Sequence, residues 1–373
     1  MKTPLIPPLV SQGQVLAEVN GCLGLITLNR PHALNALSLA MVRDIGSLLR
    51  HWLDHAAVQA VVIDGAQREG KAPAFCAGGD IRFFHQAAMA GDPALSDFFI
   101  EEYALNHLIH NYPKPYIALM DGICMGGGMG ISQGAKLRVV NENSKLGMPE
   151  TRIGFFPDVG GGYFLGQCPG STGEWLALTG QTLLAGDAIS LGLADVFVPS
   201  PAWHGVLKAL RETPQPSAEH VVATVMECVE LAPEVEQLHE RDRIDHCFGQ
   251  ANLNAVVSAL KSDGSSWAAH TLNQLAGNSP TAMELSLRLV RLGRKLSLAD
   301  ELRLELNLVH RCFESASSGR HSETLEGIRA LAIDKDHLPV WQPAGVEEIG
   351  PEVVEHFFSQ VWTPEAHPLR SLR

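Results

Sequence analysis

The chain has 373 residues, of which 46% are hydrophobic and 18% are charged, and its formal net charge is −13. This composition is typical of a globular, enzyme-like protein with enough apolar residues for a sizeable core. The acidic balance argues against generic binding to nucleic acid or to an anionic membrane, although a phosphate-bearing ligand needs only a local basic rim.

Cysteine usage and the N-terminal segment bear on the cellular compartment in which the protein resides. The seven cysteines are scattered and form no CxxC pair, so the spacing fits neither a disulfide framework nor a zinc site. The segment MKTPLIPPLVSQGQ has neither the apolar run of a secretory signal nor the Arg-rich character of a transit peptide. No apolar run is long enough for a membrane-spanning helix. We therefore expect a cytoplasmic protein.

The first 120 residues predict alternating strands and helices. Residues 15–28 predict a hairpin around Asn20-Gly21, a dipeptide that favours tight turns. Ser38 is a good N-cap for a helix whose apolar residues recur at spacings of three and four. Further along, we predict a buried strand at 61–64, helices at about 81–89 and 95–111, and a second buried strand at 116–120.

The character of the chain changes near residue 200. Short strands at 137–140 and 144–148 continue a ββα pattern, which favours an α/β core over a sandwich. Beyond residue 200 strand signals become rare, and the helical segments are 217–230, 251–262, 281–296 and 298–316. We predict an α/β core over residues 1–200 and a helical C-terminal region over residues 201–373.

Two glycine clusters carry the first chemical signal. FCAGGD (75–80) and MGGGMG (125–130) each follow a predicted buried strand and precede a predicted helix. Either cluster alone could be a simple tight turn. Two such turns can aim backbone N–H groups, unobstructed by Cβ atoms, at one point. Donors of this kind stabilise the oxyanion that forms when a carbonyl is attacked.

Two carboxylates follow the glycine clusters. Glu150 and Asp158 flank the apolar segment IGFFP, and three glycines (160–162) come directly after them. A loop acid is ordinarily a solvated charge, but this apolar setting predicts that both carboxylates face inward. Burial and a like-charged neighbour would both raise a carboxyl pKa, as acid/base chemistry often requires.

Residues 130–134 match the GxSxG pattern of α/β hydrolases. In those enzymes the serine lies on the sharp turn directly after a strand, whereas Ser132 lies about twelve residues past the predicted strand. We therefore expect Ser132 to be a small packing residue within a helix.

The order and spacing of FCAGGD, MGGGMG and PETRIGFFPDVGG resemble the crotonase (enoyl-CoA hydratase/isomerase) superfamily. Glu150 with Asp158 resembles its 3-hydroxyisobutyryl-CoA hydrolase branch. The resemblance is detailed over residues 12–200 and more diffuse in the helical half, at NSPTAMELSL and IDKDHLPVW. It implies an α/β fold of the crotonase type, which is a spiral of ββα units with a helical C-terminal region. It also implies oxyanion-hole donors at the backbone N–H groups of Gly79 and Gly127.

Position 130 departs from the hydratase pattern. Enoyl-CoA hydratases carry a second catalytic Glu there, and this chain has Gly130. The resemblance thus implies hydrolysis of a short-chain β-hydroxyacyl-CoA thioester, with 3-hydroxyisobutyryl-CoA from valine breakdown as the first candidate. Glu150 would act as general base or as nucleophile, which the sequence leaves open, and Asp158 would orient it.

The resemblance also implies substrate contacts. Glu102 matches an acid that contacts the substrate, and the turn at 32–37 would hold CoA through backbone groups of Leu34 and Ala36. Arg30 and Arg82 are candidate phosphate partners, because guanidinium suits phosphate geometry. No metal or prosthetic group is implied, since CoA arrives as part of the substrate. The sequence does not determine the oligomeric state, and a homo-oligomer is compatible with the resemblance.

Two other functions stay open. One is a different reaction of the same superfamily, either isomerisation or a hydration that uses Glu150 alone. The other is binding of acyl-CoA without turnover, for which amidation of Glu150 or Asp158 would change nothing.

Overall fold

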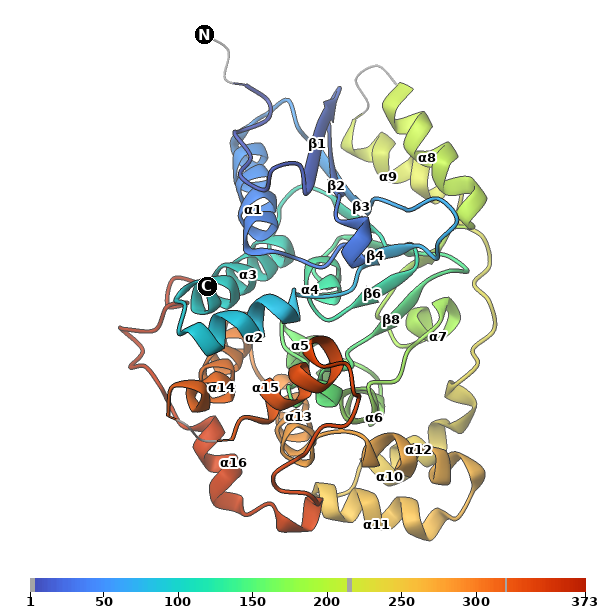
Figure 1. Ribbon diagram of the computed structural model, residues 1–373. Coiled ribbons are helices and arrows are strands. Elements are labelled where there is room, and N and C mark those ends of the chain that lie inside the picture. Colours follow the sequence, from blue (N-terminus) through green and yellow to red (C-terminus); the bar gives the residue numbers. More distant parts are fainter. Residues whose placement is uncertain (1–3, 213–216, 319–320) are drawn as a thin grey trace. The chain divides into compact units, whose positions relative to one another are not determined.

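The structure is a computed structural model that describes residues 4–212, 217–318 and 321–373 (Figure 1). Its strands form a six-stranded sheet in the order β1-β2-β3-β5-β7-β9 and a three-stranded sheet in the order β4-β6-β8. The strands of the larger sheet are β1 (Val15–Asn20), β2 (Leu23–Leu28), β3 (Ala60–Gly65), β5 (Tyr116–Leu119), β7 (Leu137–Val140) and β9 (Val196–Phe197). Those of the smaller sheet are β4 (Ala74–Cys76), β6 (Ile123–Met125) and β8 (Lys145–Gly147). The predicted α/β class is confirmed.

The N-terminal hairpin forms as predicted, with its turn one residue further on. Strands β1 and β2 are antiparallel, and Asn20 pairs with Leu23. The two turn residues are therefore Gly21 and Cys22 rather than Asn20 and Gly21. Gly21 has φ +56°, a value that glycine adopts without a steric penalty.

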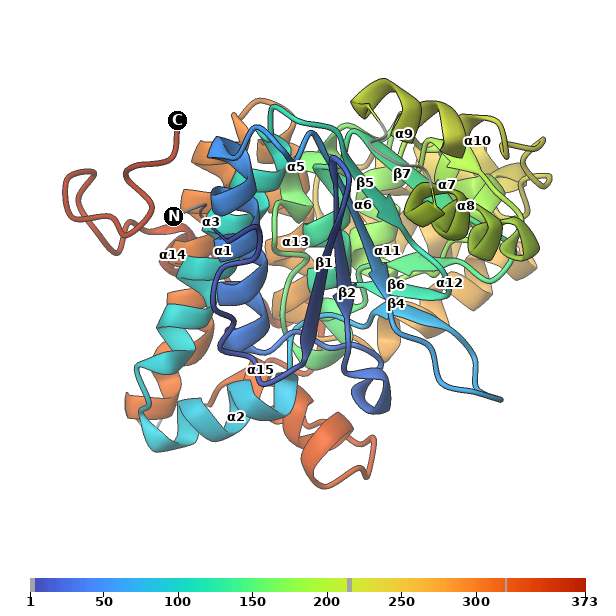
Figure 2. The ribbon, with the colours of Figure 1, turned by 90° about the horizontal axis from the view of Figure 1, so that it is seen from above.

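Helices cover both faces of the larger sheet (Figure 2). On one face, α1 (Leu39–Asp54) begins at Ser38, whose Oγ accepts a hydrogen bond from Met41 N at 3.3 Å, as the sequence predicts. A Cβ on Gly24 of β2 would lie 2.6 Å from the Trp52 ring, which shows how closely α1 packs there. On the opposite face, Trp203 and Val206 of α8 (Ser200–Glu212) join the strand side chains in one apolar core, together with α9 (Ala218–Met226).

Beyond β9 the described residues form helices and no further strand, in agreement with the predicted change near residue 200. These helices include α10 (Arg241–Phe248), α11 (Leu253–Asp263), α12 (Ser266–Ala276), α13 (Pro280–Gly293), α14 (Leu298–Ser318), α15 (Glu323–Ile328) and α16 (Pro351–Phe358). Five helices beyond β9 were not predicted from the sequence: α8, α10, α12, α15 and α16. The helices between the strands are α2 (Ile81–Ala90), α3 (Ala94–His110), α4 (Gly127–Gln133), α5 (Gly161–Gly166), α6 (Thr172–Thr179) and α7 (Ala185–Ser190).

The chain forms two compact units, and each is assembled from three segments. The first unit comprises Met1–Gly79, Ala104–Leu146 and Leu183–Glu236, and it contains the larger sheet. The second unit comprises Asp80–Tyr103, Gly147–Thr182 and Gln237–Arg373, and it is mainly helical. This division differs from the boundary near residue 200, which remains a prediction.

The second unit is held together by close helix packing. A Cβ on Gly293 of α13 would lie only 2.0 Å from the carbonyl oxygen of Gly162 in α5. The two backbones can approach this closely only because both positions lack a side chain.

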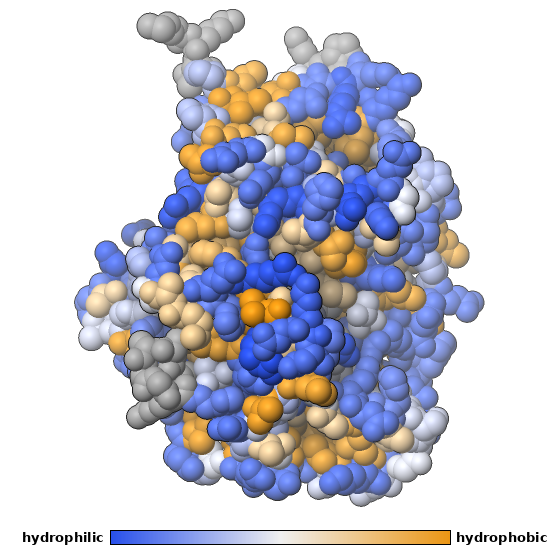
Figure 3. Space-filling model, viewed as in Figure 1, coloured by the Kyte–Doolittle hydropathy of each residue, from blue (hydrophilic) through white to orange (hydrophobic). Residues whose placement is uncertain are grey.

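The visible face of the molecule is largely hydrophilic, and its hydrophobic side chains form separate areas (Figure 3). Within the described residues, no helix is long and apolar enough to cross a membrane.

Candidate active site

The two glycine turns lie side by side in the first unit. Gly78 follows β4 with φ +104°, and Gly126 follows β6 with φ +51°. A Cβ on Gly78 would lie 3.5 Å from Gly127 N, and one on Gly128 would lie 2.4 Å from Cys76 O. Parallel pairing of β4 with β6 produces this contact, because it brings the carboxyl ends of both strands to one edge. The assignment of Gly79 and Gly127 as oxyanion donors remains a prediction.

The short helix α4 begins in the second glycine turn. Ser132 is buried in it, and its Oγ donates to Gly128 O at 2.9 Å. The packing role predicted for Ser132 is confirmed, since a buried hydroxyl bonded to its own helix cannot serve as an exposed nucleophile. Gly130 lies on the same helix, so the position that carries the second Glu in hydratases is here a buried glycine.

The predicted turn around Leu34 packs against the first glycine cluster. Leu37 N donates to Gly78 O at 2.8 Å, and Ala77 N donates to Leu34 O at 3.0 Å. Leu34 has φ +51° and is exposed. The first unit thus brings the predicted CoA turn and both glycine turns together.

The backbone groups predicted to contact CoA already have partners within the turn. Leu34 N donates to Pro31 O, and Ala36 N donates to Ala33 O. Arg30 Nη1 donates to Ala36 O at 2.8 Å, so Arg30 itself stabilises this turn. Any contact between these groups and CoA would use the second lone pair of a carbonyl oxygen.

A cavity of about 230 Å³ lies beside Leu34. Arg68 and Lys71 line it, and the sequence analysis did not single them out. The sequence feature that could have identified them is the pair of basic residues in the loop between β3 and β4. Arg82, the other predicted phosphate partner, is exposed on the first turn of α2 in the second unit.

The predicted carboxylates are buried in the second unit. Glu150 begins a 3-10 turn, η2 (Glu150–Ile153), and is 7% exposed; Asp158 is 6% exposed. Glu102 on α3 is 2% exposed, unlike a solvated helix acid. The adjacent Tyr103 donates from Oη to Asp158 Oδ2 at 2.9 Å. The inward orientation expected of Glu150 and Asp158 is confirmed, while their chemical roles remain predictions.

Burial dominates the electrostatics of these acids. It raises the pKa of Glu150 well above its ordinary value, and the nearby Asp158 raises it further. Burial and Asp158 act in the same direction on the pKa of Glu102. Burial raises the pKa of Asp158 to about 7, against the opposing effect of the Tyr103 hydrogen bond. A carboxyl group with a pKa near neutrality, as in Asp158, suits general acid/base catalysis.

Two further acids approach Asp158 from α14, and the sequence analysis missed both. Glu301 and Glu305 are fully buried, and Glu305 Oε2 accepts a hydrogen bond from Gly160 N at 2.9 Å. The backbone after Asp158 is left-handed, with φ +56° at Val159 and +88° at Gly160. Such a conformation is unfavourable for a β-branched residue, and the Glu305 hydrogen bond helps to hold it.

A sequence signal for these two acids existed. Glu301 and Glu305 precede Leu308 and Cys312 at spacings of four, three and four, which is the period of one helix face. Leu308 and Cys312 are buried too, so the acids belong to the buried face of α14. Among the residues that the structure describes, no three His, Cys, Asp or Glu side chains are placed to hold a metal ion.

The chain matches known proteins over most of its length. The family model described as enoyl-CoA hydratase/isomerase matches residues 23–358. A mitochondrial 3-hydroxyisobutyryl-CoA hydrolase from Xenopus tropicalis is 40% identical over 358 residues, which cover 94% of this chain and 90% of that protein. The human protein of the same name is 39% identical over 354 residues, which cover 93% and 89%.

Two solved structures share the fold. An enoyl-CoA hydratase from Rhodobacter sphaeroides has a TM-score of 0.84 and 38% identity, covering 95% of this chain and 99% of that one. A carnitinyl-CoA dehydratase from Mycobacterium thermoresistibile has a TM-score of 0.84 and 36% identity, covering 94% and 97%. These matches confirm the predicted crotonase-type fold.

The same comparisons correct one prediction. The two 3-hydroxyisobutyryl-CoA hydrolases named above are mitochondrial proteins, so the expectation of a cytoplasmic protein was wrong. All seven cysteines are free thiols, a property that does not distinguish the cytoplasm from other compartments in which thiols stay reduced. The family model, the named relatives and the solved structures agree with one another on the family. By its sequence and its fold, the chain belongs to the enoyl-CoA hydratase/isomerase family, on the branch of proteins named 3-hydroxyisobutyryl-CoA hydrolase.

Proposed function

We propose that this protein hydrolyses a short-chain β-hydroxyacyl-CoA thioester, with 3-hydroxyisobutyryl-CoA of valine breakdown as the first substrate to test. The observation that carries the proposal is the buried pair Glu150 and Asp158, whose pKa values are both raised, combined with a glycine at position 130. Relatives that cover nine-tenths of the chain carry the name of this activity.

The proposed reaction begins with attack on the thioester carbonyl. Glu150, as carboxylate, either removes a proton from the attacking water or itself attacks the carbonyl carbon to form an anhydride, which water then opens. In both routes the carbonyl oxygen becomes an oxyanion, for which the N–H groups of Gly79 and Gly127 would be the donors. When Glu150 acts as base, the C–S bond breaks as the oxyanion collapses, and Glu150 gives the proton taken from water to the CoA sulfur. When Glu150 acts as nucleophile, the C–S bond breaks as the anhydride forms, and the water that then opens the anhydride supplies the proton for the CoA thiolate.

Asp158, Glu102 and Tyr103 have supporting roles in this proposal. A carboxyl group that keeps its proton near neutral pH can donate a hydrogen bond to the substrate, and burial favours that form for Asp158 and Glu102. Tyr103 fixes the position of the Asp158 carboxyl group through its hydrogen bond. Water is the only co-reactant, and the products are the free hydroxy acid and CoA.

Hydration of an enoyl-CoA is the second candidate, because the two solved structures described above are named as a hydratase and a dehydratase. Those reactions transfer a proton to or from carbon and leave the C–S bond intact. Gly130 opposes this candidate, since the helix position of the second acid has no side chain.

One experiment separates the candidates. The protein is incubated with 3-hydroxyisobutyryl-CoA and with crotonyl-CoA, while thiol release and loss of enoyl absorbance are followed separately. We expect thiol release from the first substrate, its loss in Glu150→Gln, and its retention in Glu227→Gln, which changes an exposed acid. Loss of enoyl absorbance without thiol release would instead identify a hydratase, and silence in both assays would favour an acyl-CoA-binding protein.

A further inference from the structure

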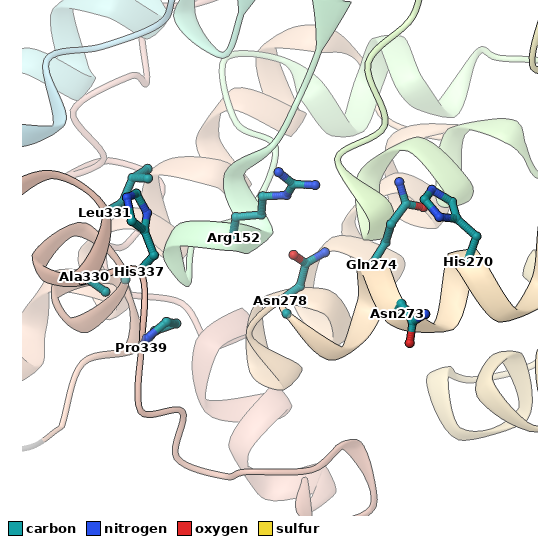
Figure 4. Close-up of a pocket in the computed structure, with 11 residues that line it drawn as sticks. Arg152, His270, Asn273, Gln274, Asn278, Ala330, Leu331, His337 and Pro339 are labelled. Atoms are coloured by element: carbon teal, nitrogen blue, oxygen red, sulfur yellow. The ribbon is translucent and has the colours of Figure 1, made fainter. Parts of the chain in front are cut away.

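A second cavity, of about 470 Å³, lies within the second unit (Figure 4). Arg152 and Asn278 lie at its centre, with Gln274 and His270 on one side and Leu331 and His337 on the other. These residues come from η2, α12, the connection between α12 and α13, and the segment after α15. None of them belongs to the proposed catalytic group. The volume falls within the range of small-molecule sites, about 300–1,000 Å³.

The lining of the cavity carries one formal positive charge and no negative charge, in a protein whose net charge is −13. The lining contains Arg152, two histidines and three side-chain amides, and it contains no Asp or Glu. Several other arginines of the second unit are paired with carboxylates. Arg294 bonds Glu174 at 2.6 Å, Arg288 bonds Glu355 at 2.6 Å, and Arg329 bonds Asp334 at 2.6 Å. Arg152 makes no ion pair with any described residue, which leaves its charge available to a ligand.

The walls of the cavity are fixed by hydrogen bonds that do not involve the Arg152 guanidinium. Gln274 Nε2 donates to Gln181 Oε1 at 2.8 Å, and Asn278 Nδ2 donates to Leu178 O at 2.8 Å. On the other side, His337 N donates to Ala330 O at 3.1 Å. Arg329 also bonds Asp336, directly before His337, at 2.7 Å. A site whose walls are already ordered loses little entropy when a ligand enters.

We propose that this cavity binds a small molecule through a phosphate or carboxylate group, with the Arg152 guanidinium as the main contact. The planar fork of the guanidinium pairs with two oxygens of either group, and the imidazoles of His270 and His337 are further donors. The ordered side-chain amides would bind the polar remainder of the ligand, and Leu331 offers an apolar contact at the rim.

Occupation of the cavity would act on Glu150 through the backbone. Arg152 lies two residues after Glu150 on the same 3-10 turn. That turn is anchored by Ser279 N, which donates to Thr151 O at 3.0 Å, and by Phe155 N, which donates to Glu150 O at 3.1 Å. Through this turn, a ligand held by Arg152 would reach the backbone that positions Glu150. This effect on turnover rests on the proposed function, whereas binding itself does not.

Binding is tested by calorimetric titration of the full chain with inorganic phosphate and, separately, with malonate. We expect the wild type to bind at least one probe, and Arg152→Gln to weaken that binding about tenfold, the loss of one charge-assisted pair. Arg50→Gln, which removes an exposed arginine of the first unit, should bind as the wild type does. Arg152→Lys should recover only part of the affinity, because it keeps the charge and loses the fork.

Absence of binding to the wild type by both probes, or equal affinity in Arg152→Gln, would overturn the proposal. The source of the oxyanion group follows from kinetics on the CoA ester. If Arg152→Gln raises KM and phosphate competes with the ester, the group belongs to the CoA part of the substrate. If KM is unchanged while phosphate binding is lost, the ligand is a separate small molecule. Because the titrations need no turnover, a failure of the proposed activity would not be confused with a failure of this site.

Discussion

Tyr103 Oη donates a hydrogen bond to Asp158 Oδ2 at 2.9 Å, and both side chains are buried. This bond favours the ionised form of Asp158 and so opposes the rise in its pKa that burial causes. The protonation of Asp158 near neutral pH thus depends on a tyrosine that immediately follows Glu102 in the chain.

The first prediction concerns this tyrosine. Tyr103→Phe removes the donor, so the pKa of Asp158 should rise and the limb of the pH–rate profile that reports it should move to higher pH. The measurement is kcat/KM from pH 5 to 9, in which we expect a displacement of about one unit. Tyr112→Phe is the control, because Tyr112 Oη donates only to a backbone oxygen, Leu49 O, in the first unit. Equal profiles for the two variants would contradict the assignment.

The second prediction concerns stability as a function of pH. Burial raises the pKa of Glu301 to about 7, above the value near 4 expected when the chain unfolds. The unfolded state therefore loses this proton first, and the contribution to stability falls as pH rises from about 4 through 7. Glu301→Gln should raise Tm by several degrees at pH 8.5 and change it little at pH 5.

Glu314 on the same helix provides a control of opposite sign. Its hydrogen bond with Arg311 lowers its pKa, and the pair lies at the surface. Glu314→Gln should therefore give no gain at pH 8.5, with at most a small loss. A Tm that rises equally in both variants at pH 8.5 would show that reduced net charge, rather than burial, explains the effect.

The third prediction concerns packing at Gly162. A Cβ there would lie 2.4 Å from Glu301 Oε1 and 2.8 Å from Leu289 Cγ. Gly162→Ala should therefore destabilise the protein by roughly 1–3 kcal/mol, the usual effect of overpacking. Gly205→Ala on α8 has open space around the new methyl group and should be neutral or stabilising. Urea denaturation compares the two, and equal midpoints would show that the second unit can relax around α5.

The fourth prediction concerns the basic cavity beside Leu34. If Arg68 and Lys71 contact the phosphates of a CoA ester, Lys71→Gln should raise KM several-fold with kcat nearly unchanged, and salt should reduce the difference. The matched control is Lys208→Gln, which changes an exposed lysine on α8 in the same unit. A fall in kcat at unchanged KM would rule out a simple binding role for Lys71.

Local signals determined which elements could be predicted. The Ser38 cap, the hairpin and the short strand at 137–140 each depend on a few neighbouring residues, and each forms where expected. Helix α10 was missed because its eight residues, RDRIDHCF, contain four charges and few apolar positions. The turn moved by one residue because strand pairing extends through Asn20.

Local sequence signals also determined which site residues could be predicted. Glu150 and Asp158 stand in a distinctive apolar and glycine-rich segment, so their burial could be predicted. Glu301 and Glu305 stand in an ordinary amphipathic helix, where acids are usually solvated. Their place on the apolar face of α14 was the local signal, whereas the contact between Glu305 and Gly160 joins residues 145 positions apart and could not be predicted.

That separation has a consequence for synthesis of the protein. Ribosomes add about 5–20 residues per second. Glu305 is therefore made roughly 7–30 seconds after Gly160, whose N–H donates a hydrogen bond to it in the folded protein. Throughout that interval the loop after Asp158 lacks the carboxylate that helps to hold its left-handed backbone. A nascent chain shorter than 305 residues therefore lacks one of the buried acids near Asp158. A stop codon placed after the α/β region should yield an incompletely folded protein that chaperones bind and proteases degrade.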